Sequence, residues 1–178
     1  MVGAAVAWLG LGSNLGHPEQ QIAAAIQAIA ELPHTRLLSQ SSLYESAAWG
    51  TSTAQPDYLN AVVAIETTLG PQALLDALHH IERARGRVRA GERYAARTLD
   101  IDLLLHGDRQ IDTAALTLPH PRLHERAFVL LPLVEIAPTL SVPGRGRVAD
   151  LLAALSPAEI AGVRKFGRHD RPVSSENH

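Results

Sequence analysis

The sequence predicts an α+β fold in which two helices connect four strands and short helices follow. Apolar runs of strand length recur along the chain. Two intervening segments carry apolar residues at helical spacing, and glycine or proline marks the ends of most segments. The resulting order, strand, helix, strand, strand, helix, strand, is the split βαβ pattern. We therefore expect a ferredoxin-like βαββαβ sandwich with appended C-terminal helices.

The composition is that of an ordinary globular domain. The chain has 178 residues, of which 46% are hydrophobic and 19% are charged, and this length is enough to bury a core. We expect residues 1–166 to form a single domain, residues 167–178 to be a disordered polar tail, and no length to remain for a second domain. A net charge of −2 argues against a general nucleic-acid binder.

The absence of cysteine excludes disulfides and thiolate metal sites and agrees with a reducing compartment. Residues 1–15 are apolar, but they lack a basic segment and are interrupted by Gly10, Gly12 and Asn14. They therefore predict a buried strand and turn, and neither a signal peptide nor a membrane span. We expect a cytoplasmic monomer that binds neither membranes nor nucleic acid.

The first third of the chain predicts three strands and one helix. A strand at residues 4–11 ends in a glycine-rich turn, and a helix over residues 18–32 follows. A second strand at residues 36–44 leads into a long polar loop at 45–57, and Tyr58–Thr67 predicts a third strand. The glycine-rich turn lacks the Gly-Lys-Ser/Thr of a phosphate loop, so turn geometry explains it better than phosphate binding does.

The next segment predicts a helix, a mobile loop and an acidic strand. Residues 71–86 form the helix, residues 87–97 the arginine-rich loop, and residues 97–105 lead into and form the strand. A hairpin signal at 106–108 then predicts a short edge strand near residues 109–112.

Two short helices are expected beyond this point. Residues 118–128 read as a proline-braced segment that runs into a helix limited by Pro132. A further helix is expected over residues 148–155.

Two aspartates stand two residues apart in the acidic strand. Side chains alternate along a strand, so Asp100 and Asp102 share one face and the apolar residues between and beside them face a core. Those apolar residues are Leu99, Ile101, Leu103 and Leu105. Residues on the same face lie about 6.6 Å apart, and paired divalent ions in phosphoryl-transfer sites lie about 3.5–4 Å apart. The spacing suits a platform for two Mg²⁺ ions, although two solvated acids on an exposed sheet face explain it too.

A run of arginines directly before the acidic strand supplies positive charge that can bind phosphate groups. Of the 16 basic residues, six are arginines between Arg83 and Arg97. Several arginines on one loop can close over a polyphosphate, and a solvated charged face is the alternative. Because the run leads directly into the acidic strand, we favour a nucleotide with its metal ions.

Four further side chains are candidates for a binding site. Trp49 lies in the polar loop and either covers a ligand or folds back on the core. Tyr58 and Asn60 share one strand face and suit a planar heterocycle. A capping or turn role near the start of the strand is the alternative for Asn60. His120 stands between two prolines, which favours a fixed donor, although a lone histidine is more often an incidental loop residue.

Five motifs occur in order across about residues 6–140. They are Gly-Ser-Asn-Leu-Gly at 12–16, Gln-Pro-Asp-Tyr-Leu-Asn-Ala at 55–61, Ile-Glu at 81–82 with Gly-Arg-Val-Arg at 86–89, Arg-Thr-Leu-Asp-Ile-Asp at 97–102, and Leu-Pro-His-Pro-Arg at 118–122 with Glu-Arg-Ala-Phe at 125–128. In this set and order, the chain resembles the 6-hydroxymethyl-7,8-dihydropterin pyrophosphokinase family. The resemblance implies a ferredoxin-like fold and transfer of the pyrophosphoryl group of ATP to the hydroxymethyl of the reduced pterin. AMP is released, in a step of tetrahydrofolate biosynthesis.

The resemblance also implies site residues by position. Catalytic roles fall on Arg87, Arg97, Asp100 and Asp102, with the two aspartates holding two Mg²⁺ ions that bridge the ATP phosphates. Pterin contacts fall on Ser46, Trp49, Tyr58, Asn60 and Phe128, with Tyr58 and Phe128 stacking on the two ring faces. ATP contacts fall on Glu82, Arg89, Arg93, Tyr94, Thr117, His120 and Arg126.

Three positions depart from the family pattern. Tyr94 stands where many members have tryptophan, Ser46-Ala47 replaces Thr-Pro, and Ala115 stands where some members have arginine. None of these changes removes a metal ligand, so we expect activity to survive.

Two other classes of protein use similar parts. A two-metal nuclease also combines acids with arginines, but it needs a basic surface and stacking aromatics, and aromatics are only 4% of this chain. A non-catalytic ligand-binding module of the same fold would have no use for two acids beside six arginines. Incubation with ATP, Mg²⁺ and the reduced pterin tests these classes: AMP supports the pyrophosphokinase, ADP indicates ordinary phosphoryl transfer, and no nucleotide turnover leaves the nuclease or the binding module.

Overall fold

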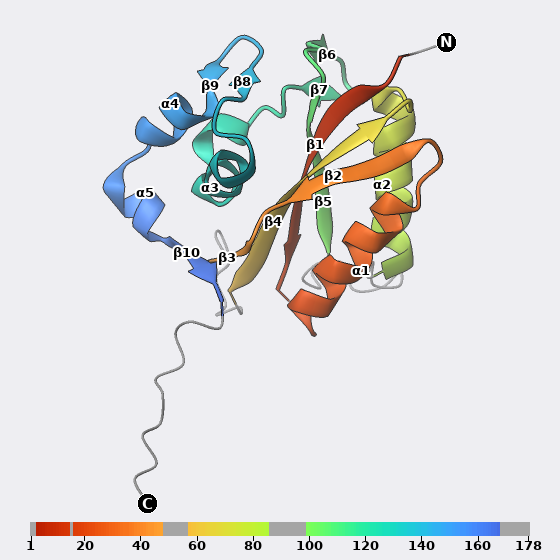
Figure 1. The fold of residues 1–178 in the computed structure, drawn as a ribbon. Helices are drawn as coiled ribbons and strands as arrows, with labels where there is room; N and C mark the ends of the chain where they lie inside the picture. The colour runs from red at the N-terminus through yellow and green to blue at the C-terminus, as the bar shows by residue number, and fades with distance from the viewer. Residues whose placement is uncertain (1–2, 15, 48–56, 86–98, 168–178) are drawn as a thin grey trace, which may run out of the picture.

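The computed structural model describes residues 3–14, 16–47, 57–85 and 99–167. Within these ranges one antiparallel sheet forms the middle layer, and helices cover both of its faces (Figure 1). Its strands are β1 (Ala5–Ser13), β2 (Thr35–Gln40), β3 (Leu43–Ser46), β4 (Tyr58–Thr67), β5 (Asp100–His106) and β10 (Val163–Phe166). The strands run in the order β10, β3, β4, β1, β5, and β2 also pairs with β4.

The first two helices join the strands in the predicted ferredoxin-like order. Helix α1 (Pro18–Ala30) connects β1 to β2, and helix α2 (Pro71–Arg85) connects β4 to β5. Strand β4 pairs antiparallel with both β1 and β2, which is the split βαβ arrangement. The α+β ferredoxin-like fold is therefore confirmed.

The sheet buries a different hydrophobic layer on each face. Helices α1 and α2 cover one face, where the core includes Leu9, Ile29, Val63, Leu74 and Leu78. Helices α3 (Ala127–Ile136) and α4 (Val148–Ala153) cover the other, where it includes Val62, Leu104, Leu123, Leu130 and Leu133. Side chains alternate along β4, so adjacent valines belong to opposite layers.

An irregularity in β5 changes one predicted orientation. Leu9 pairs with Leu103, but its neighbour Trp8 pairs with Leu105, which leaves Leu104 as an extra residue. Such a bulge shifts the following side chains to the other face. Leu105 therefore packs in the core beneath α3, and the prediction that it faces the same core as Leu103 is wrong.

The two strands before the long loop also differ from prediction. Strand β1 continues to Ser13, so Gly10 and Gly12 lie in a strand and not in a turn. The single strand expected at 36–44 is two strands, β2 and β3, with a break at Ser41. That serine exchanges hydrogen bonds with the backbone of Val62 through both its N–H and its hydroxyl.

The short strand after β5 does not join the main sheet. Strand β6 (Ile111–Asp112) pairs with β7 (Thr117–Leu118) in a separate ribbon, so the predicted edge-strand partner is wrong. The chain leaves the sheet at Gly107, which has a φ of 56° and donates its N–H to the carbonyl of Val6.

Helix α3 runs past the proline that was expected to limit it. Pro132 lies inside the helix, which ends at Ile136. A proline removes one N–H bond, here that to the carbonyl of Phe128 in the first turn, and the later turns keep theirs.

The C-terminal part contains elements that the sequence did not predict. Strands β8 (Ser141–Val142) and β9 (Gly146–Arg147) form a hairpin, a 3₁₀ turn η1 spans Leu123–Glu125, and helix α5 spans Pro157–Ala161. A capping box of Ser156 and Glu159 starts α5. Helix α4 ends at Ala153, two residues before the predicted end.

Strand β10 then returns the chain to the sheet beside β3 (Figure 1). The tail expected from residue 167 lies outside the described residues from 168 onward. Across the described ranges, no helix is both long and apolar enough to cross a membrane.

Candidate active site

Four residues, one each from β3, β4, β1 and β5, lie in one row across the sheet. Tyr44 pairs with Asn60, Asn60 with Gly12, and Gly12 with Asp100. Residues paired in this way project from the same face of a sheet. Because Gly12 has no side chain, a space remains between Asn60 and Asp100.

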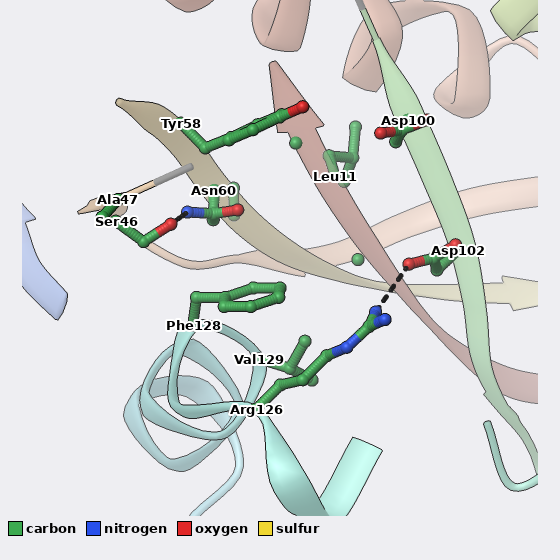
Figure 2. A pocket seen from close by; sticks show the side chains of 13 residues that line it. Leu11, Ser46, Ala47, Tyr58, Asn60, Asp100, Asp102, Arg126, Phe128 and Val129 are labelled. Carbon is green, nitrogen blue, oxygen red and sulfur yellow. Dashed lines mark hydrogen bonds and ion pairs between the residues drawn. The ribbon is translucent and has the colours of Figure 1, made fainter. Parts of the chain in front are cut away.

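That space is a cavity of about 280 Å³, here called the aromatic cavity (Figure 2). Its lining includes Ser46, Tyr58, Asn60, Asp100, Asp102 and Phe128. Figure 2 shows Tyr58 and Phe128 on opposite sides of Asn60, with the two aspartates across the cavity. The sheet thus supplies one wall, and the start of α3 supplies the facing aromatic ring.

Two glycines missed by sequence reasoning as site residues shape this cavity. Gly10 and Gly12 both line it. A Cβ on Gly12 would stand 3.4 Å from the Oδ1 atom of Asn60, at the short end of van der Waals contact, and would fill part of the cavity. The detectable signal was glycine at alternate positions of an apolar strand, which leaves one face without side chains.

A second cavity, of about 370 Å³, lies on the other side of the aspartates and is here called the histidine cavity. Its lining includes His79, Glu82, Asp100, Asp102, Thr117 and His120. Asp100 and Asp102 are thus common to both cavities. His79 is a lining residue that sequence reasoning missed, and its place on α2 gave no signal beyond helical spacing.

Strand β5, which carries the two aspartates, is hydrogen-bonded to residues outside the sheet. Glu82 of α2 is buried and accepts a hydrogen bond of 2.9 Å from the backbone N–H of Ile101, which lies between the two aspartates. His120 donates its backbone N–H to the carbonyl of Leu104 in the same strand, at 2.9 Å. The two contacts hold the strand at Ile101 and at Leu104, against α2 and against the segment that contains His120.

Arg126 lines the aromatic cavity directly before α3, beside Asp102, which both cavities share. Its Nη1 atom lies 3.6 Å from Oδ2 of Asp102, and its guanidinium carbon lies 5.5 Å from the ring centroid of Phe128. This arrangement is a cation–π contact combined with an ion pair. A positive charge is therefore available where the two aspartates meet the aromatic ring.

The imidazole of His120 is held in one tautomer. Its Nδ1 atom accepts the backbone N–H of Arg122 at 3.2 Å, so the neutral ring carries its proton on Nε2. Burial lowers the pKa of His120; the charge of Asp102 opposes this, and Arg126 and Arg122 lower the pKa further. The ring is thus a neutral N–H donor at neutral pH.

Asn60 is fixed by two neighbouring groups on β3. Its Nδ2 donates to the Oγ of Ser46 at 2.8 Å and to the carbonyl of Tyr44 at 3.3 Å. Its oxygen end points toward the cavity (Figure 2). Asn60 thus presents an acceptor to whatever occupies the cavity.

The carboxylates of Asp100 and Asp102 are the candidate metal ligands of this site. Among the described residues, no group of three or more His, Cys, Asp or Glu side chains could hold an ion. Mg²⁺ needs few protein ligands because it keeps waters and binds substrate phosphates. Asp100 and Asp102 therefore fit Mg²⁺ as oxygen donors that need a phosphate to complete the site.

The structure brings together every predicted site residue that it describes. Ser46, Tyr58, Asn60, Arg126 and Phe128 line the aromatic cavity; Glu82, Thr117 and His120 line the histidine cavity; and Asp100 and Asp102 line both. Arg126, expected among the ATP contacts, lies on the aromatic side of the aspartates. Trp49, Arg87, Arg89, Arg93, Tyr94 and Arg97 lie outside the described residues.

A ferredoxin-like sandwich with paired acids between two cavities fits the class of phosphoryl- and diphosphoryl-transfer enzymes. Residues 8–138 match the family model of 7,8-dihydro-6-hydroxymethylpterin-pyrophosphokinase, and the chain belongs to this family. It is therefore a pyrophosphokinase that transfers a pyrophosphoryl group from ATP to a hydroxymethyldihydropterin in folate biosynthesis. The activity expected from the sequence is confirmed.

Curated relatives carry the name 2-amino-4-hydroxy-6-hydroxymethyldihydropteridine pyrophosphokinase. The Haemophilus influenzae protein is 47% identical over 146 residues, which is 82% of this chain and 90% of the relative. The Pseudomonas aeruginosa protein is 46% identical over 147 residues, 83% of this chain and 90% of the relative. The Methylorubrum extorquens protein is 44% identical over 157 residues, 88% of this chain and 98% of the relative.

Solved structures share the fold. An HPPK-DHPS structure in complex with substrates has a TM-score of 0.72 at 12% identity and covers 92% of this chain. The Plasmodium falciparum HPPK-DHPS A437G structure with SDX-DHP has a TM-score of 0.66 at 14% identity and covers 86%. This chain spans 46% of each of those two chains.

Proposed function

We propose that pyrophosphoryl transfer takes place across Asp100 and Asp102, with the pterin in the aromatic cavity and ATP in the histidine cavity. The observation that carries this placement is that both aspartates line both cavities. A group that moves from one substrate to the other must cross the wall that the two sites share. Carboxylates at that wall are the natural ligands for the ions that accompany a triphosphate.

The aromatic cavity suits a flat heterocycle with hydrogen-bonding edges. Tyr58 and Phe128 offer ring faces on opposite sides of Asn60, and Asn60 presents its amide oxygen to the space between them (Figure 2). An acceptor in this position would bind amino or ring N–H groups of a reduced pterin. Ser46 holds Asn60 in that orientation, and Trp49 is a further proposed contact.

Asp100 and Asp102 would hold two Mg²⁺ ions through their carboxylates. When bound, the ions supply charge neutralisation for the phosphates and orient the reacting oxygens. The ions' remaining ligands would be water and phosphate oxygens, because Mg²⁺ usually takes only one or two protein carboxylates.

The ATP phosphates would meet neutral and cationic donors. His120 presents Nε2–H from the histidine cavity, and Arg126 brings a guanidinium to the shared wall. Glu82 and Thr117 line the same cavity and are the proposed nucleotide contacts there. Arg87, Arg89, Arg93, Tyr94 and Arg97 complete the proposed ATP and catalytic set.

In the proposed reaction the hydroxymethyl oxygen of the pterin attacks the β-phosphorus of ATP in line. The bond from that phosphorus to the α,β-bridging oxygen breaks, AMP leaves, and the hydroxyl proton is released to solvent. The part of this chain is to bind and orient: Tyr58, Asn60 and Phe128 hold the pterin, and Arg126 stabilises negative charge as it spreads over the transferring group. Positioning and charge stabilisation account for most of the acceleration in this chemistry.

Three broader expectations stay proposals. We propose that residues 1–166 act as one pyrophosphokinase domain, that the enzyme works as a monomer, and that it works in the cytoplasm. The first is supported by the row of site residues on one sheet, because residues within this range line both cavities. The second stays as expected from the sequence. The ATP that the enzyme consumes supports the third.

The test is product analysis on matched variants. Wild-type protein with ATP, Mg²⁺ and the reduced pterin should give AMP, and D102N and D102A should lose turnover while keeping the wild-type melting temperature within a few degrees. D108N changes an exposed aspartate after β5 and should stay active. An active D102A protein would refute the metal assignment.

The two cavities are separated by the same assay. F128A should raise the KM for the pterin, and H120Q should raise the KM for ATP. If both variants change the same KM, the assignment of one substrate to each cavity is wrong.

A further inference from the structure

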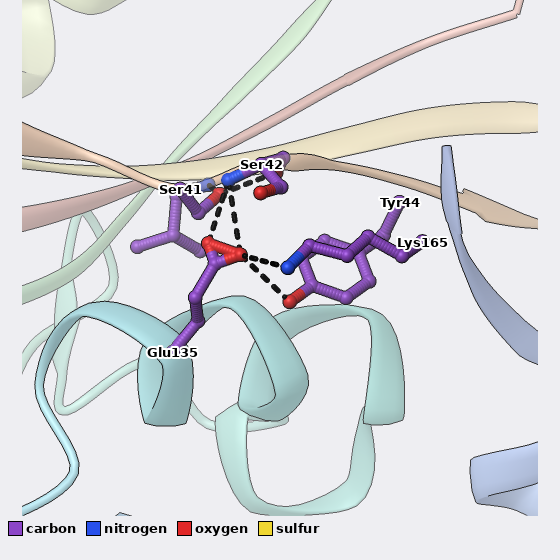
Figure 3. Close-up of polar contacts among 6 residues, drawn as sticks. Ser41, Ser42, Tyr44, Glu135 and Lys165 are labelled. Atoms are coloured by element: carbon purple, nitrogen blue, oxygen red, sulfur yellow. Dashed lines mark hydrogen bonds and ion pairs between the residues drawn. The ribbon is translucent and has the colours of Figure 1, made fainter. Parts of the chain in front are cut away.

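Glu135 joins three segments of the chain at one carboxylate (Figure 3). It projects from α3 and accepts the backbone N–H of Ser42 at 2.7 Å on Oε2 and 3.2 Å on Oε1. It also accepts the hydroxyl of Tyr44 at 3.0 Å, and Nζ of Lys165 in β10 lies 3.5 Å from Oε1. Glu135 therefore connects α3 to the start of β3 and to β10.

The position of Glu135 on α3 relates it to the aromatic cavity. Phe128, which lines the cavity, precedes Glu135 by seven residues, about two turns of an α-helix. Residues at this spacing project from the same side of a helix. One side of α3 thus carries the proposed pterin-stacking ring at its start and the Glu135 carboxylate near its end.

Strand β3 shows the matching arrangement. Tyr44 and Ser46 lie two residues apart and so project from the same face. Tyr44 contacts Glu135, and Ser46 lines the aromatic cavity. Strand β3 and helix α3 therefore face each other at two positions. Tyr44 contacts Glu135 at one of them, and Ser46 lies across the cavity from Phe128 at the other.

The same strand orients Asn60. The carbonyl of Tyr44 and the hydroxyl of Ser46 both accept the amide N–H groups of Asn60, at 3.3 and 2.8 Å. Tyr44, Ser46 and Asn60 are all buried, at 7, 4 and 5% exposure. A shift of β3 relative to α3 would therefore turn the Asn60 oxygen as well as change the opening between Ser46 and Phe128.

We propose that Glu135 is a positioning residue for the pterin: it fastens α3 to β3, which sets the opening of the aromatic cavity and the orientation of Asn60. The proposal rests on the placement of the pterin in that cavity. Glu135 itself does not line the cavity, so it acts through Tyr44, Ser46 and Asn60 and not by contact with substrate.

The charge state of Glu135 supports this role. Burial acts to raise its pKa, but the hydrogen bonds from Ser42 and Tyr44 and the charge of Lys165 outweigh burial, so its pKa is lowered. Glu135 is therefore ionised at neutral pH and accepts its hydrogen bonds as an anion. Charged acceptors bind more strongly than neutral ones, which suits a contact that has to hold two elements together.

The experiment compares steady-state constants of E135Q, Y44F and wild type. E135Q keeps the side-chain volume and removes the charge, and Y44F removes only the hydroxyl donor. We expect E135Q to raise the KM for the pterin by about five- to thirtyfold, at most the scale of one lost hydrogen bond to a charged group. We expect a smaller rise in Y44F, and a KM for ATP within about twofold of wild type in both.

A stability control separates positioning from general loosening. I29V removes one methylene from the core between α1 and the sheet, on the face opposite α3. It should lower the melting temperature and leave both KM values unchanged. If the KM for the pterin rises in I29V as it does in E135Q, or if E135Q raises both KM values equally, Glu135 is only structural and the proposal is wrong.

F128A distinguishes failure of this inference from failure of the substrate placement. A raised pterin KM in F128A with an unchanged one in E135Q and Y44F would overturn the role of Glu135 alone. An unchanged pterin KM in F128A would overturn the placement of the pterin and the inference with it. Should E135Q fail to fold, Y44F decides, because it leaves the contact of Glu135 with Ser42 intact.

Discussion

The guanidinium of Arg126 contacts Asp102 and Phe128 at once, with Nη1 3.6 Å from the carboxylate and the guanidinium carbon 5.5 Å from the ring centroid. One side chain therefore links the acid proposed to hold metal to the ring proposed to stack on the pterin. The planar shape of arginine makes both contacts possible, because a flat group can lie over a ring while its edge reaches an acid.

We expect replacement of Arg126 to impair turnover according to how much of this geometry is lost. R126K keeps the charge but not the planar contact, and it should lower kcat/KM about tenfold; R126A should lower it about a hundredfold, or about 3 kcal/mol of transition-state stabilisation. R36K, an exposed position paired with Glu66 across β2 and β4, is the control and should stay within about twofold of wild type. Equal activity of R126K and wild type would show that charge alone suffices.

Gly12 should be required for space in the aromatic cavity. An added Cβ would meet Asn60 Oδ1 at 3.4 Å and the Tyr58 ring at 3.8 Å, so G12A should raise the KM for the pterin with little change in the KM for ATP. G70A is the matched control, because a Cβ there meets nothing within 4 Å. An unchanged pterin KM in G12A would mean that the pterin does not occupy this space.

Removal of Glu82 should destabilise the acidic strand. In E82A the buried N–H of Ile101 loses the carboxylate that accepts it at 2.9 Å, which should lower the free energy of unfolding by about 1–3 kcal/mol. E82Q keeps an acceptor oxygen and should lose less. Urea denaturation measures both, and equal losses in the two variants would assign the effect to the charge and not to the hydrogen bond.

The titration of Tyr44 should report on Glu135. Burial, then the hydrogen bond to Glu135 and its negative charge, raise the pKa of Tyr44 from 10.0 to about 12. The folded state holds this proton more tightly than the unfolded chain does. The resulting stability is therefore complete below pH 10 and is lost as the pH rises through 12, by on the order of 1–2 kcal/mol.

Tyrosinate absorbance tests this expectation. One of the chain's three tyrosines should ionise near pH 12 in the wild type, at lower pH in E135Q, and be missing from the Y44F titration. If no tyrosine ionises near pH 12, Tyr44 is less buried or its contact with Glu135 is weaker in solution than in the structure.

The sequence predicted the elements that carry strong local patterns. The third strand matches Tyr58–Thr67 residue for residue, and Asp100 and Asp102 share a face as alternation requires. Helices α1 and α2 begin where proline predicted. These features depend on the spacing of apolar residues and on the residues that begin and end each element, and both can be read from neighbouring positions in the sequence.

What the sequence could not predict depends on contacts between distant segments. The bulge that sends Leu105 to the opposite core arises from pairing with β1, which local alternation does not contain. Strand β10 has four residues, mostly exposed, so it carries little hydrophobic signal, and only its pairing with β3 defines it. The role of Glu135 was likewise hidden, because its partners Ser42 and Tyr44 are distant in sequence.

Strand β10 also bears on the order in which the enzyme can be completed. It pairs with β3 and brings Lys165 to Glu135, yet among the strands that the structure describes it is the last to be synthesised. During translation, β1, β3, β4 and β5 can form their ladders as the ribosome proceeds, whereas the outer edge of β3 stays unpaired until β10 is made, a pairing of high contact order. The nascent chain can thus assemble its acidic centre before β10 covers the outer edge of β3 and brings Lys165 to Glu135.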